Sequence, residues 1–159
     1  MKLRIALREL HRSERKLARE LSGIAARHVT EHEVRHVALD IRRWSVNHIA
    51  ALADVGRRYE LNLRPEPRAE AVGAGLQERV STLLGRRPEP ALLLLADLRR
   101  LHRVAAGVSL DWELLAQGAQ AAQDIELVEL CRRCHPETLR QLRWANGMLK
   151  TLSPQALVS

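Results

Sequence analysis

The sequence has few of the residues from which many cores and sites are built. It contains no phenylalanine, aromatic residues make up 3% of the chain, and there are two cysteines. Leucine, alanine and valine must therefore fill the interior, which favours helices packed closely on one another. A chain of 159 residues is long enough to bury one such core without disulfides. We expect a single domain.

Long apolar runs are also missing. The longest one spans residues 91–96 and ends at Asp97, whereas a membrane-spanning helix needs roughly 20 apolar residues. The first residues alternate apolar side chains with arginine, unlike the basic start and apolar run of a signal peptide. We therefore expect a cytoplasmic protein with no transmembrane segment, in which both cysteines are reduced thiols.

The spacing of the apolar residues predicts helices along most of the chain. Alternating steps of four and three residues form one stripe over 3–28, polar only at Glu14 and His28. Three more helices are expected at about 31–60, 91–117 and 122–152. Thr30 and Glu33 have the spacing of a capping box for the second helix, and Pro136 predicts a kink or break in the last one. Residues 62–90, rich in proline and glycine, predict a crossover with a short helix, and 153–159 a tail.

The connections between the predicted helices are short, long and short in turn, which predicts an all-α fold: an antiparallel four-helix bundle with a long crossover. This domain is expected to span residues 1–152. With the stretches SLDWELLAQGAQAAQD and CHPETLRQLRWANGMLKTLSPQAL, this topology resembles the ferritin-like superfamily, in particular small uncharacterised bacterial members. The resemblance implies a di-iron site built from two Glu residues and two E-x-x-H motifs. Glu33 and His36 match one motif, but Arg132 follows Glu129 where the second would need histidine. The usual di-iron set is incomplete.

A different polar cluster is expected at the middle of the bundle. If the hairpins turn near residues 29–30 and 120, five side chains come to a similar depth: His11, Glu14, His48, His102 and His135. Imidazole and carboxylate suit a transition metal such as Fe, Zn or Mn. The alternative is a structural polar layer in which Glu14 pairs with His48 or an arginine, because a buried carboxylate needs a partner. In that case leucine at position 14 is expected to be tolerated or even to stabilise.

Cys131, Cys134 and His135 spell C-x-x-C-H, the signature of covalently attached haem. Cytochromes c-prime, which are also helical bundles, carry this motif late in their fourth helix. Three features oppose haem here: no export segment is expected, Pro136 follows His135 directly, and both cysteines lie on or beside the apolar stripe of their helix, where buried thiols pack well.

The sequence alone leaves two functions open. The first is a non-catalytic helical bundle that acts through assembly or by binding a protein partner. The second is a metal-binding or oxidoreductase bundle that uses the polar cluster. Surplus apolar residues, namely 91–95, Trp144, Leu149, Leu152 and Leu157, favour a homodimer. The net charge of +7 and the arginine stripe Arg4, Arg8, Arg12, Arg15 and Arg19 do not favour nucleic acid, since no aromatic residues interleave to stack on bases.

Overall fold

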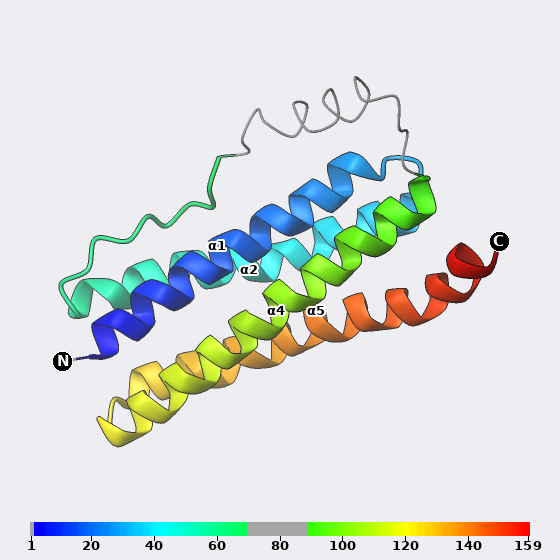
Figure 1. Ribbon diagram of the computed structural model, residues 1–159. Coiled ribbons are helices and arrows are strands. Elements are labelled where there is room, and N and C mark those ends of the chain that lie inside the picture. Colours follow the sequence, from blue (N-terminus) through cyan, green and yellow to red (C-terminus); the bar gives the residue numbers. More distant parts are fainter. Residues whose placement is uncertain (1, 70–88) are drawn as a thin grey trace.

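The computed structural model describes residues 2–69 and 89–159. Four helices dominate these ranges: α1 (Leu3–Arg27), α2 (His32–Arg58), α4 (Pro90–Ala121) and α5 (Ile125–Val158). No strand occurs in either range, and the helices pack together side by side (Figure 1). The prediction of an all-α four-helix bundle is therefore confirmed.

The helices form two hairpins. A turn at residues 28–31 joins α1 to α2, and a turn at 122–124 joins α4 to α5. In Figure 1, α2 ends at one end of the bundle and α4 begins at the other. The short helix expected within 62–90 falls largely on residues 70–88, outside the described part. α1 packs closely on α2 and on α4, and α4 on α5, whereas α2 and α5 approach each other less closely.

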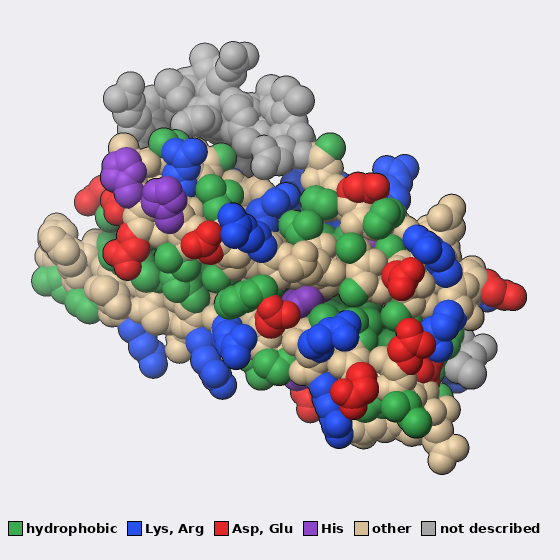
Figure 2. Space-filling view, turned by 180° about the vertical axis from the view of Figure 1, so that it is seen from behind, with side chains coloured by type: hydrophobic (Ala, Val, Ile, Leu, Met, Phe, Trp, Pro, Cys, Tyr) green, Lys and Arg blue, Asp and Glu red, His purple; other side chains and the backbone are tan. Residues whose placement is uncertain are grey.

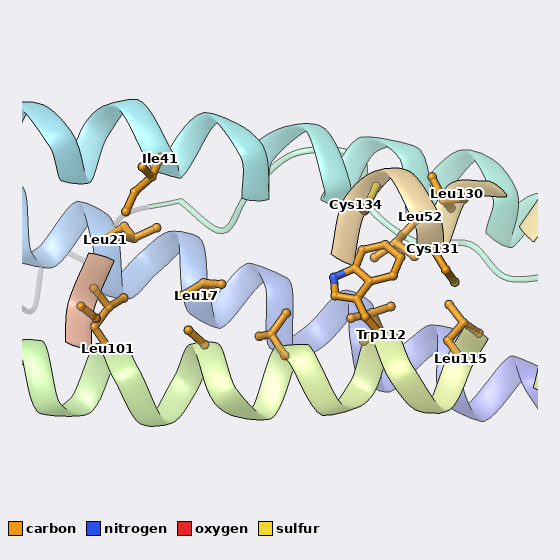
Figure 3. Packing of buried hydrophobic residues seen from close by; sticks show 14 of the residues in the cluster. Leu17, Leu21, Ile41, Leu52, Leu101, Trp112, Leu115, Leu130, Cys131 and Cys134 are labelled. Carbon is orange, nitrogen blue, oxygen red and sulfur yellow. The ribbon is translucent and has the colours of Figure 1, made fainter. Parts of the chain in front are cut away.

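The apolar stripe of α1 is buried as its spacing predicts. Leu7, Leu10, Leu17, Leu21 and Ile24 have no exposed surface. Each such side chain stabilises the fold by roughly 1.5–3 kcal/mol relative to an exposed one. The largest fully buried side chain is that of Trp112 on α4, which packs at the same level as the two cysteines of α5 (Figure 3).

Several predicted boundaries need correction. The capping box is not formed: α2 begins at His32 with Glu31 as N-cap and no side-chain cap, because Thr30 lies in the turn one residue too early. α5 runs unbroken through Pro136 and continues to Val158, so most of the expected tail is helical. Pro136 is exposed, and the carbonyl that its missing amide leaves unbonded belongs to exposed Arg132, where water can bond to it.

Polar contacts fix the two ends of the bundle. At one end Asp97 of α4 is buried, and its Oδ2 accepts bonds from Arg27 Nε (2.8 Å) and His28 Nε2 (2.7 Å). Burial alone would raise the pKa of Asp97, but the hydrogen bonds and charges of His28 and Arg27 hold it below its ordinary value. At the other end Asp124 caps α5 by accepting from Leu127 N and from the Tyr59 hydroxyl. Neither acid was anticipated from spacing.

The surface mixes charge with apolar side chains. Figure 2 shows Arg and Lys spread over one face of the molecule, with Asp, Glu and hydrophobic groups between them. On α1, Arg8, Arg12 and Arg19 of the arginine stripe are exposed, and Arg12 pairs with Glu9 at 3.1 Å. Among the helices described, none has the length and apolar character needed to cross a membrane.

Candidate functional site

Glu14 lies at the centre of a polar layer inside the bundle. It occupies a position of the α1 stripe that leucine fills elsewhere, and its side chain is 0% exposed. Its Oε1 accepts three hydrogen bonds: from His48 Nδ1 on α2 (2.7 Å), from Trp112 Nε1 on α4 (2.8 Å) and from Thr138 Oγ1 on α5 (3.4 Å). All four helices therefore converge on one carboxylate oxygen.

His48 extends the layer toward α5. Its ring is 1% exposed and stands edge-on to Trp112, with centroids 5.5 Å apart. Nδ1 donates to Glu14, and Nε2 lies 3.3 Å from Glu137 Oε1. Burial alone would lower the pKa of His48, but interactions with Cys134 and Glu14 outweigh it and raise the pKa to about 10. The ring is therefore an imidazolium at neutral pH, with a hydrogen on each nitrogen.

The two cysteines face this layer from α5. Both are free thiols buried in the hydrophobic core, where Figure 3 shows them near Trp112 and Leu52. Burial raises the pKa of Cys131 to about 12, with a smaller contribution from Cys134. Cys134 is 4% exposed, and it is among the groups that raise the pKa of His48. A C-x-x-C spacing on one helix thus gives two thiols with different surroundings.

One turn further along α5 the layer continues with Gln141. Its Nε2 donates to Ile41 O (2.8 Å) and Ser45 Oγ (2.9 Å) on α2. Within residues 2–69 and 89–159, no donor bonds to the buried acceptors Glu14 Oε2 and Gln141 Oε1 of the layer. Such groups normally bond to something, so the layer can accept hydrogen bonds from an added donor.

Two of the five predicted metal ligands meet, which confirms the predicted contact of Glu14 with His48. The other three have different partners or surroundings. His11 Nε2 bonds to Arg64 O at 2.7 Å, and burial lowers the pKa of His11. His135 Nε2 lies 2.8 Å from Ser109 Oγ, and His102 is half-buried. Over residues 2–69 and 89–159, no three His, Cys, Asp or Glu side chains are arranged to hold a metal ion.

Sequence reasoning missed the remaining members of the layer. Trp112 was placed on the core stripe, but nothing in its spacing shows that the indole N–H is directed at Glu14. Glu137 and Thr138 flank the C-x-x-C-H motif and bond to His48 and Glu14 respectively. Their position could have indicated this role, because both residues lie one turn after Cys134 on α5, at the same depth of the bundle as His48.

Comparison of the chain with protein-family models, with curated proteins and with solved structures gives no match in any of the three. The function must therefore be argued from the side chains themselves.

Proposed function

We propose that this chain is a non-catalytic, ferritin-like antiparallel bundle that acts by self-association or by binding a protein partner, most simply as a cytoplasmic homodimer. The observation that carries the proposal is an exposed apolar end. Leu157 is 69% exposed and Val158 is 87% exposed at the end of α5. Leu92 and Leu93 are exposed at the start of α4, which lies at the same end of the bundle (Figure 1). We name these four residues the end patch.

The bundle has no need of the end patch for its own core. Half-buried Leu149 and Leu152 pack against the core from the last turns of α5, whereas Leu157 and Val158 follow them on the helix and are exposed. Covering a leucine or valine contributes roughly 1.5–3 kcal/mol per side chain. A second copy that brings its own end patch doubles this gain by symmetry.

Sedimentation velocity across a concentration series tests the proposal. We expect the wild-type chain to sediment above the mass of one 18.0 kDa chain at micromolar concentration. Leu157→Asp combined with Leu92→Asp should give the monomer. Leu114→Asp is the matched control, because Leu114 is an exposed leucine of α4 far from the patch. A monomeric wild type, or equal effects of patch and control variants, would contradict self-association through this end.

The second candidate is a metal-binding or oxidoreductase bundle using His11, Glu14, His48, His102 and His135. The observation in its favour is the buried Glu14 Oε2, to which no donor bonds in the part of the chain that the structure describes. Elemental analysis and an absorption spectrum of untagged protein test it. Stoichiometric Fe, Zn or Mn in the wild type that is lost in Glu14→Ala would support metal binding. A Soret band would support haem attached at Cys131 and Cys134. A protein that shows no metal and no Soret band would support the first candidate.

A further inference from the structure

Two histidines lie one helical turn apart at the start of α2. His32 is the first residue of the helix, and His36 follows four positions later. Both are exposed, and among residues 2–69 and 89–159 no other histidine is. Figure 2 shows two histidine side chains next to each other at one end of the molecule. On a helix this spacing places the two Cβ atoms about 5–6 Å apart on one face, so both imidazoles can bind one transition-metal ion.

The letters of this stretch, residues 32–36, spell H-E-x-x-H. In zinc proteases such a motif lies on a helix, where the two histidines bind zinc and the glutamate acts as a base. A catalytic zinc site needs a third ligand from the protein. In the described part of the chain no third His, Cys, Asp or Glu side chain completes a metal group. One copy of the chain is therefore half of a zinc site.

We propose that His32 and His36 bind Zn²⁺ and that the same pair from a second copy completes the coordination, so that one ion joins two chains. The proposal deepens the self-association proposed above, on which it rests, by naming a ligand that two copies share. A two-fold axis through the ion makes the two pairs equivalent. Four imidazole nitrogens then surround the ion at about 2.0–2.1 Å, in the tetrahedral arrangement that zinc prefers.

The histidine pair lies at the end of the bundle that carries the end patch. The turn before α2 is held to α4 by the hydrogen bond between His28 and Asp97. Leu92 and Leu93 of the end patch belong to the first turn of α4. In Figure 1 the start of α2, the start of α4 and the C-terminus all lie at this end. A second copy that covers the end patch therefore approaches the start of α2.

Exposed apolar side chains flank the pair. Leu39 follows His36 by three positions, which places it on the same face of α2. Val29 lies in the turn that precedes the helix. Both side chains are exposed, and neither belongs to the end patch. A second copy seated on the histidines would remove this apolar surface from water, which favours an interface around the metal.

The charge around the pair also favours a cation. Residues 31–40 carry three exposed carboxylates, Glu31, Glu33 and Asp40, and one arginine, Arg35, in a chain whose net charge is +7. Such a local excess of negative charge raises the concentration of cations nearby. Asp40 lies one turn after His36, where a carboxylate can accept a hydrogen from the ring nitrogen that does not bind the metal.

Zinc should also stabilise the start of α2. Glu31 occupies the N-cap position, and its side chain makes no capping hydrogen bond. An ion held by His32 and His36 ties the first turn of the helix to the second. Because the metal binds the folded helix, it should raise the urea concentration at which the chain unfolds.

Equilibrium dialysis against zinc chloride and sedimentation velocity test the proposal on the untagged full chain. We expect one zinc ion per two chains. We also expect the chain to associate at a protein concentration about tenfold lower or less with zinc than with EDTA. Mg²⁺ should have neither effect, because it prefers oxygen ligands and keeps its water.

Variants of single histidines locate the site. His32→Ala and His36→Ala should each weaken zinc binding about tenfold or more and remove the effect of zinc on association. Both should associate in EDTA as the wild type does, because exposed side chains contribute little to folding. The matched control is His102→Ala, at a half-buried histidine of α4, which should bind zinc as the wild type does.

Several results would overturn the proposal: no zinc binding, one ion per chain without tighter association, binding that survives both histidine substitutions, or binding lost in His102→Ala. The comparison with EDTA separates this proposal from the end patch. Association in EDTA that zinc does not tighten supports the end patch and overturns the zinc site. A chain that is monomeric in EDTA and dimeric with zinc supports the zinc site and contradicts the end patch.

Discussion

Replacing Glu14 with leucine should be one of the most destabilising single changes in this bundle. The substitution removes the acceptor of three hydrogen bonds, from His48, Trp112 and Thr138. Removing one partner of a buried ion pair costs roughly 3–5 kcal/mol, and each further buried donor left unbonded costs about 1–3 kcal/mol. Leucine regains some of this by adding apolar surface and by removing the desolvation cost of the carboxylate. We expect a net loss of about 4 kcal/mol in the free energy of unfolding.

Urea unfolding at neutral pH, followed by far-ultraviolet circular dichroism, measures the effect. Glu14→Gln should cost less, about 1–2 kcal/mol, because its carbonyl can still accept while the charge that pairs with His48 is lost. Glu14→Leu combined with His48→Leu should recover part of the loss, since an apolar pair leaves no charge unpaired. The matched control is Glu137→Gln, at the other nitrogen of His48: this partly exposed carboxylate should contribute less than about 1 kcal/mol.

A Glu14→Leu chain as stable as the wild type would refute this reasoning. It would mean that the polar layer is not held together by its carboxylate. The double variant separates the causes further: if it is no more stable than Glu14→Leu alone, the unpaired imidazolium is not the source of the loss.

Four further predictions concern pH and packing. Folding raises the pKa of His48 from about 6.5 to about 10, so the contribution of the protonated ring to the free energy of unfolding is complete below pH 6.5 and is lost as pH rises toward 10. The difference in urea stability between the wild type and His48→Gln should therefore shrink between these pH values. A difference that stays constant would contradict this prediction. Because folding lowers the pKa of Asp97, its contribution is present above the pKa of the unfolded chain and is lost on acidification, so Asp97→Asn should flatten the acid side of the stability curve. Gly107→Ala should stabilise by up to about 1 kcal/mol, since its added Cβ meets nothing within 4 Å. Gly118→Ala should destabilise by about 1 kcal/mol in the same assay, since its Cβ would lie 2.6 Å from Leu3 Cδ2; equal effects of the two alanines would contradict this reading of the packing.

The sequence by itself determined the four helices, the two hairpins and the burial of the α1 stripe. These features follow from local periodicity and from the lengths of the connections, which a chain carries without reference to its fold. The same reasoning placed Glu14 in the interior and paired it with His48, because both lie on core stripes and at the same depth of a hairpin. Boundaries were less well determined: Thr30 failed as a cap by one residue, and α5 continues past Pro136 because that proline lies on the exposed side of the helix.

Only the tertiary structure decided how the polar layer is satisfied. From the sequence, Glu14 needed a single partner, and leucine at this position was expected to be tolerated or to stabilise. In the structure three donors bond to Glu14 Oε1, so we now expect leucine to destabilise the bundle because it would leave all three without an acceptor. The structure likewise gave His11 and His135 hydrogen-bond partners outside the layer. Helical periodicity fixes which face a residue occupies, but the rotation and separation of neighbouring helices fix which side chains meet across the core. Those quantities depend on the packing of the whole bundle at once.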